Sequence, residues 1–171
     1  MECNKSTKNI YLIIRGYSFK EISDNKEKSF FSSIKNIKGL NISNSKITTE
    51  YAAKIITKCL YLKDLNISNN NLKDIKDDEI NAINGILGNL KSLNLLLTEI
   101  NLRLFIEFIK RCPLIEELNL IWVSKKIRID CAKNIIRYLE KIKKINIHEA
   151  FINNESINFF KEKVPNVLTL E

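Results

Sequence analysis

The sequence predicts an α/β fold assembled from repeated strand-and-helix units, and two observations carry the prediction. Apolar anchor residues return at separations of 28, 25, 28, 25, 27 and 25 residues along the 171-residue chain. Between the anchors, apolar residues recur with the spacing of one helix face. The anchors, each the second apolar position of its unit, are Leu12, Leu40, Leu65, Leu93, Leu118, Ile145 and Leu170. Repetition over nearly the whole length predicts a single repeat domain, residues 1–171.

The anchor segments are expected to be short strands. Apolar residues flank one polar residue in most of them, as in Leu65-Asn66-Ile67, which is the period of a strand with one buried face. We therefore predict strands near residues 11–14, 39–42, 64–67, 92–95, 117–120 and 144–147.

The segments between the strands are expected to be helices. Two apolar columns, four residues apart, keep their phase through six units, as on one buried helix face. One column consists of Phe30, Ile55, Ile83, Phe108, Ile135 and Phe160. The other consists of Ile34, Cys59, Leu87, Cys112, Leu139 and Val164. Asp74, Asp77, Asp78 and Glu79 precede the helical run 80–87 and are interpreted as caps of its N-terminus.

One unit carries a specific motif. Residues 62–72, LKDLNISNNNL, match the leucine-rich repeat pattern LxxLxLxxNxL at every specified position when Ile is allowed for Leu. The chain therefore resembles the helix-bearing, ribonuclease-inhibitor-like branch of the leucine-rich repeat family. This resemblance implies a horseshoe-shaped solenoid of about six repeats, with a parallel β-sheet on the concave face and helices on the convex face. The ninth-position Asn survives only as Asn70, so irregular turns are expected at Tyr17, Ser45, Thr98, Val123 and Ala150.

The residue types argue against catalysis. The chain has one His, no glycine-rich phosphate loop and no serine-containing elbow, so a nucleophile, a base and an orienting group are not brought together. Cys59 and Cys112 occupy one helical column two repeats apart, beyond the reach of a disulfide. We expect Cys59, Cys112 and Cys131 to be buried, reduced thiols. No enzyme activity, cofactor or metal is predicted.

Charge and hydropathy leave the compartment open. The formal net charge is +8, but only 5 of the 28 basic residues are Arg, which nucleic-acid sites usually favour. The excess of Ile, Lys and Asn is typical of an A+T-rich genome and is compatible with an effector secreted by a parasite. The apolar run 10–14 is too short for a membrane span or a signal peptide. We therefore expect a soluble chain with no membrane partner, cytoplasmic or secreted after loss of a leader.

The preferred hypothesis is a non-enzymatic protein-binding module that uses its concave face, as the resemblance implies. The alternative is a module associated with RNA or ribonucleoprotein, because the chain is basic. We expect a monomer, and the alternative is a dimer in which the final strand pairs at its open edge.

Two groups of residues are candidates for contact with the partner. An apolar cluster with the only Trp of the chain is typical of an interface hot spot and consists of Leu96, Leu97, Ile121 and Trp122. The second group occupies the fifth repeat position, which points out of the concave sheet, and consists of Asn66, Asn94, Asn119 and Asn146. For Leu97 and Trp122 the alternative is burial in the core. For the Asn residues it is a ladder of side-chain hydrogen bonds between adjacent strands.

Overall fold

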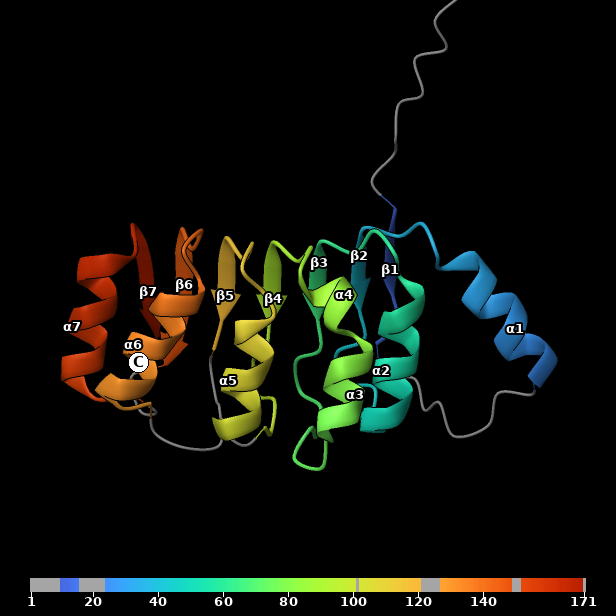
Figure 1. Ribbon diagram of the computed structural model, residues 1–171, viewed down its shortest axis with the longest axis horizontal. Coiled ribbons are helices and arrows are strands. Elements are labelled where there is room, and N and C mark those ends of the chain that lie inside the picture. Colours follow the sequence, from blue (N-terminus) through green and yellow to red (C-terminus); the bar gives the residue numbers. More distant parts are fainter. Residues whose placement is uncertain (1–9, 16–23, 101, 121–126, 149–151, 171) are drawn as a thin grey trace, which may run out of the picture.

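The computed structural model describes residues 10–15, 24–100, 102–120, 127–148 and 152–170. Its strands form one parallel sheet in which each strand pairs with the next along the chain (Figure 1). The strands are β1 (Tyr11–Ile13), β2 (Gly39–Asn41), β3 (Asp64–Asn66), β4 (Ser92–Asn94), β5 (Glu117–Asn119), β6 (Lys144–His148) and β7 (Asn166–Leu170). The six strands predicted from the sequence are therefore confirmed to within one or two residues.

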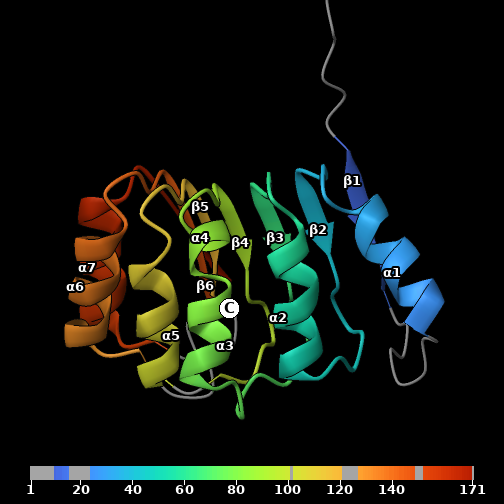
Figure 2. The same cartoon turned by 45° about the vertical axis from the view of Figure 1, so that its right-hand side comes forward.

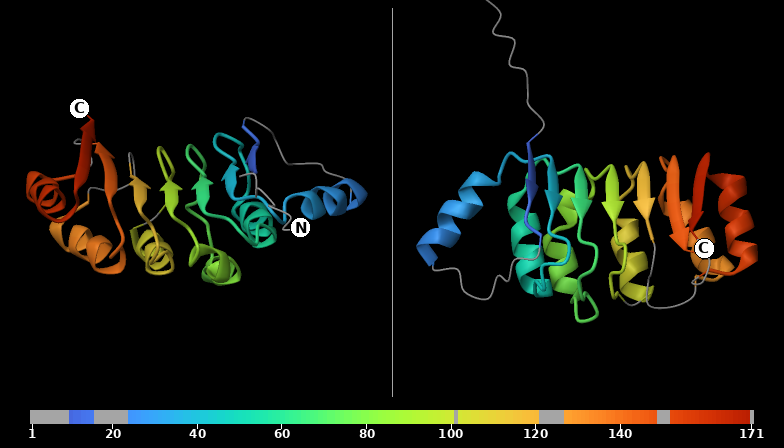
Figure 3. Two further views of the ribbon diagram at one scale, coloured as in Figure 1. Left: turned by 90° about the horizontal axis from the view of Figure 1, so that it is seen from above. Right: turned by 180° about the vertical axis from the view of Figure 1, so that it is seen from behind.

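A helical segment links each strand to the next, so every connection is a crossover on the same side of the sheet. The helices are α1 (Asp24–Ser33), α2 (Thr49–Lys58), α3 (Asp77–Ala82), α4 (Asn84–Leu87), α5 (Leu102–Lys110), α6 (Ile129–Tyr138) and α7 (Asn154–Lys163). Viewed from above, the strands line the inside of an arc and the helices its outside (Figures 2 and 3). This arrangement is the predicted horseshoe.

Local sequence explains where the helices begin. The side-chain oxygens of Thr48 and Asn153 accept hydrogen bonds from backbone N–H groups in the first turns of α2 and α7. The Glu79 carboxylate accepts the Lys76 N–H at 2.7 Å, which confirms the capping role predicted for the acidic cluster. The run predicted as one helix over 80–87 is divided at Ile83 into α3 and α4.

The core lies between the sheet and the helices. The anchors from Leu40 to Ile145 are almost fully buried, and so are both helical columns, apart from Phe30, which is half-buried. The three cysteines of the described chain are buried thiols, as predicted. Burial raises the pKa of Cys59 to about 12 and that of Cys131 to about 11, so both stay protonated at neutral pH.

The last anchor was predicted three residues too late. Ile145 pairs with Val167, and Leu170 pairs with His148 beyond the anchor position. The cause is a short connection: α7 ends at Lys163 and β7 begins at Asn166, whereas α5 and β5 are separated by the six residues 111–116. Val164 therefore both ends the helical column and precedes Val167 by three residues, which is the spacing between the first and second anchors of the other units, so the final unit is three residues shorter.

The ninth repeat position forms a buried polar column beneath the loops that leave the strands. Asn70 donates its amide to the Ile42 carbonyl of the preceding repeat at 2.9 Å. The hydroxyl of Ser45 donates to the Ile14 carbonyl at 2.7 Å, and that of Thr98 to the Ile67 carbonyl at 3.1 Å. The irregular turns expected at Ser45 and Thr98 are thus not found, because a hydroxyl replaces the Asn amide. Tyr17, Val123 and Ala150 lie outside the described residues.

Candidate protein-binding face

The concave face is built from two columns of side chains, at the third and fifth repeat positions. Strand alternation points both columns away from the core, while the fourth position is buried between them. The strand register aligns the fifth position into one row, which runs Ile13, Asn41, Asn66, Asn94, Asn119, Asn146 and Leu168. The predicted alignment of Asn66, Asn94, Asn119 and Asn146 is therefore confirmed.

Among the described residues, Asn41, Asn66 and Asn94 do not form the ladder considered as the structural alternative for the row. The Oδ1 atoms of Asn41, Asn66 and Asn94 accept the backbone N–H two residues further on, at 3.0, 3.0 and 2.9 Å. Each bond turns the chain out of the strand and limits it to three residues. Among the described residues, the Nδ2 groups of these three amides have no further partner, so their N–H donors remain available on the concave face.

Asn146 differs from the other members of the row. β6 continues through His148 instead of turning after Asn146, because its neighbour β7 extends the pairing by two residues. The local bond is then lost, and the buried Oδ1 atom of Asn146 has no hydrogen-bond partner. The hydrogen bonding of the row therefore changes at β6, where this acceptor is buried and is not presented to a ligand.

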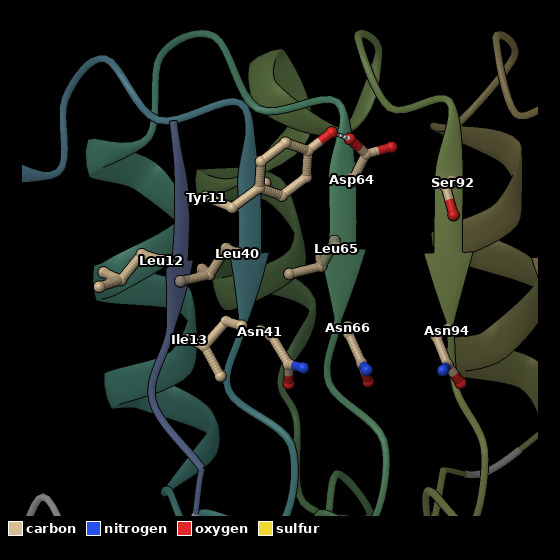
Figure 4. A pocket seen from close by; sticks show the side chains of 11 residues that line it. Tyr11, Leu12, Ile13, Leu40, Asn41, Asp64, Leu65, Asn66, Ser92 and Asn94 are labelled. Carbon is tan, nitrogen blue, oxygen red and sulfur yellow. Dashed lines mark hydrogen bonds between the residues drawn. The ribbon is translucent and has the colours of Figure 1, made fainter. Parts of the chain in front are cut away.

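A hollow of about 270 Å³ lies over β1 to β4. The Tyr11 ring crosses β2 above Gly39, and its hydroxyl donates to Asp64 Oδ2 at 2.8 Å (Figure 4). This bond and the negative charge of Asp64 raise the pKa of Tyr11 above its ordinary value. Gly39 permits the crossing, because a Cβ atom there would lie 1.9 Å from Tyr11 Cδ1. Asn41, Asn66 and Asn94 line the opposite side of the hollow.

A second hollow of about 120 Å³ continues the first along the sheet. Ser92 and Asn94 line both hollows, so they are neighbouring parts of one surface. Beyond them the third position becomes charged, with Glu117 on β5 and Lys144 on β6. The concave face is thus an open trough of amides and a few charges.

Two of the apolar candidates, Leu96 and Leu97, directly follow the segment of β4 that lines this trough. Leu97 has 42% of its surface exposed, so its alternative placement in the core is wrong. Leu96 is half-buried and donates its N–H to Asn94. Leu97 has φ of 54°, a left-handed conformation that the equivalent Asn44 and Asn69 share. Ile121 and Trp122 lie outside the described residues.

Sequence reasoning missed the third column, and with it Tyr11, Gly39 and Asp64. Residues two apart on a strand share a face, so the same alternation that selected Asn66 also selects Asp64. The first unit was recognised mainly by its spacing, which left Tyr11 without a position in the pattern. The contact between Tyr11 and Asp64 spans two repeats and follows only from the strand order.

The described residues contain neither a metal-binding cluster nor a membrane-spanning helix. No cluster of three or more His, Cys, Asp or Glu residues that could hold a metal ion occurs among them. None of the helices they form is both long enough and apolar enough to cross a membrane.

The fold is that of a leucine-rich repeat protein. Among solved structures, the chain is similar to the leucine-rich repeat-containing protein LegL7 from Legionella pneumophila, with a TM-score of 0.60 and 17% sequence identity. The similarity covers 89% of this chain and 53% of LegL7, so the chain spans about half of that protein's length. No protein-family model and no curated protein matches the chain. At this identity the likeness concerns the fold alone.

Proposed function

We propose that the protein is a non-enzymatic module that binds a protein partner in the trough of its concave face, acting as a single domain over residues 1–171. The observation that carries this proposal is the row of amides in which Asn41, Asn66 and Asn94 each use Oδ1 internally and keep their Nδ2 donors available. Donors fixed in this way lose little conformational entropy when they meet a ligand.

The chemistry of the trough favours a polypeptide as the ligand. Amide donors on adjacent parallel strands repeat about every 4.8 Å, and backbone carbonyl groups are suitable acceptors for them. The exposed side chains of Ile13 and Leu97 add apolar contact beside this polar row, as at other protein interfaces. Ile121 and Trp122 are proposed as part of the same edge, on the basis of their repeat positions.

Selective disruption of the trough tests the proposal. Ser92→Arg with Glu117→Arg fills the trough where the two hollows meet, without touching the buried anchors. The matched control, Asn158→Arg with Glu155→Arg, makes the same change of charge on the exposed surface of α7. Each chain is used to capture partners from the native cell.

We expect the wild type and the α7 control to capture the same protein, and the trough variant to lose it. Far-UV circular dichroism checks that all three are folded. Equal capture by a folded trough variant contradicts the proposal. A second pair, Leu96→Asp with Ile121→Asp, tests the apolar edge: we expect loss of the partner with the fold retained.

A further inference from the structure

The loops that lead from each helix into the next strand lie side by side along one rim of the solenoid. A series of backbone hydrogen bonds joins them: the N–H of Lys63 donates to the Lys38 carbonyl, and that of Lys91 to the Lys63 carbonyl, both at 2.7 Å. The series continues from Glu116 to Lys91 and from Lys143 to Glu116. This rim runs along the top of Figure 1 and faces the viewer in the left panel of Figure 3.

We call these loops, residues 34–38, 59–63, 88–91, 111–116 and 139–143, together with the last turns of the adjoining helices, the basic rim. The loops hold seven Lys or Arg residues and only two Glu residues, so they are strongly cationic. The last helical turns add five bases, Lys58, Lys110, Arg137, Lys161 and Lys163, and two acids, Glu107 and Glu162, which pair with Lys110 and Lys163. The opposite rim carries the acidic first turns of α2, α3, α6 and α7.

Helix dipoles account for only part of this separation of charge. Bases in a last turn and acids in a first turn stabilise a helix. Lys35, Lys63 and Lys141 lie in the loops beyond the helices, are exposed, and form no ion pair among the described residues. Their charge therefore has no structural use in the described part of the chain.

Exposed apolar side chains lie on the same rim, between the lysines. Leu60 and Tyr61, in the loop between α2 and β3, are 52% and 59% exposed. Leu114, in the loop between α5 and β5, is 43% exposed. Ile10, directly before β1, is 51% exposed, and its carbonyl accepts the N–H of Lys38. Bulky apolar groups thus occur at three separate places along a cationic rim.

We propose that the basic rim docks on the surface of an anionic lipid bilayer. Lysines near such a surface are attracted by its negative potential, and exposed Leu, Ile and Tyr side chains enter the headgroup region. Three of the four exposed apolar side chains are aliphatic and cannot stack on bases, which only Tyr61 can do. The charge is mostly Lys, so a bilayer fits the rim better than a nucleic acid does. The inference departs from the expectation of no membrane partner, which rested on the lack of a spanning segment.

Docking through the rim leaves the concave trough accessible. The rim is at the N-terminal ends of the strands, whereas the trough is the face of the sheet itself. The two surfaces are therefore proposed independently. The Ser92→Arg, Glu117→Arg variant should still bind vesicles, and vesicle binding by the wild type would stand even if the trough captured no protein.

Co-sedimentation of the full chain with lipid vesicles tests the inference. The vesicles contain phosphatidylcholine alone or phosphatidylcholine with phosphatidylserine. The rim variant is Lys35→Glu, Lys63→Glu, Lys141→Glu. Its control, Lys28→Glu, Lys46→Glu, Lys133→Glu, changes the net charge equally at exposed sites away from the rim. Circular dichroism confirms that both are folded.

We expect the wild type and the control to bind only the vesicles that contain phosphatidylserine, and less well as salt increases. Each rim lysine contributes about five-fold in affinity, so the rim variant should bind about 100-fold more weakly. Leu60→Asn with Leu114→Asn should remove the binding that persists at high salt. Equal vesicle binding by the rim variant and the control overturns the inference. So does a wild-type chain that binds polyuridylate but none of the vesicles.

Discussion

Replacing Gly39 by Ala should have opposite effects on stability depending on whether Tyr11 is present. Gly39 begins β2 and is paired with both β1 and β3. In a strand, Ala ordinarily gives a free energy of unfolding about 0.5–1 kcal/mol higher than Gly does, because Ala loses less backbone entropy on folding. In this protein, however, the added Cβ atom would lie 1.9 Å from Cδ1 and 2.2 Å from Cε1 of the Tyr11 ring. Ordinary contacts are 3.4–4 Å, so the ring must leave its position over β2.

The magnitude follows from what the ring loses. Displacement breaks the 2.8 Å hydrogen bond from Tyr11 to Asp64, with a net effect of about 1 kcal/mol at most for an exposed pair, and it uncovers part of the ring. Gly39→Ala should therefore be neutral or destabilising by about 1 kcal/mol in the wild type. In a Tyr11→Ala chain the clash is absent, and the same change should stabilise by about 0.5–1 kcal/mol.

Urea unfolding of the four chains in this double-mutant cycle measures the coupling free energy, for which we expect about 0.5–2 kcal/mol. Tyr11→Phe provides a further comparison, because it removes the hydroxyl but keeps the ring and hence the clash. Gly39→Ala should be less unfavourable in that chain than in the wild type, because the hydrogen bond is already absent and only the packing of the ring can still be lost. If Gly39→Ala changes stability equally with and without the Tyr11 ring, the crossing of β2 by Tyr11 does not occur in solution.

Three further outcomes follow from individual residues. The Leu97→Asn chain should be about 1 kcal/mol more stable than the Leu97→Ala chain in thermal melts. Both lose the contacts of Leu97, but only Asn adopts the left-handed backbone conformation at this position with little strain. Equal melting temperatures contradict this. Hydrogen bonds from Lys143 and Lys91 lower the pKa of Glu116 to about 2, so its stabilising effect is complete above its ordinary pKa of 4.5 and is lost as pH falls toward 2. The melting temperatures of the wild type and Glu116→Gln should thus converge at low pH. Cys112→Ser should destabilise by roughly 1–3 kcal/mol in urea, while a reducing agent should leave the wild-type melting temperature unchanged.

The fold could be predicted because each repeat has the same spacing of apolar residues in its strand and its helix. A column such as Phe108, Ile135 and Phe160 is weak information in one unit and strong information over six. Among the anchors, the prediction was wrong only in the last unit, where the anchor is Val167 rather than Leu170. There the repeat period itself changes, since the connection before β7 is shorter, and no later unit exists within the sequence to reveal the shift.

The site was predictable in position but not in its hydrogen bonding. Strand alternation placed Asn66 and Asn94 on the concave face, as observed. Whether an Asn side chain bonds across strands or to its own backbone depends on the turn that follows, and that turn involves residues such as Leu96 that the pattern does not specify. The Tyr11 crossing was not predictable either, because the repeat pattern gives the order of the strands but not the direction in which the Tyr11 side chain lies across them.

The buried column of Ser45, Asn70 and Thr98 gives the solenoid a polarity. Each of these side chains donates to a carbonyl of the preceding repeat, so the side-chain donors of this column point toward the N-terminal side. Loss of a repeat from the C-terminal side uncovers this carbonyl and also backbone N–H groups, such as that of Ser45, which donates to Asn70 Oδ1 at 3.2 Å. Loss from the N-terminal side removes the acceptor of a side chain with 5% or less of its surface exposed. The two ends of the solenoid are therefore not chemically equivalent: a new N-terminal end leaves a side-chain donor of the column without its acceptor, whereas a new C-terminal end leaves backbone groups uncovered.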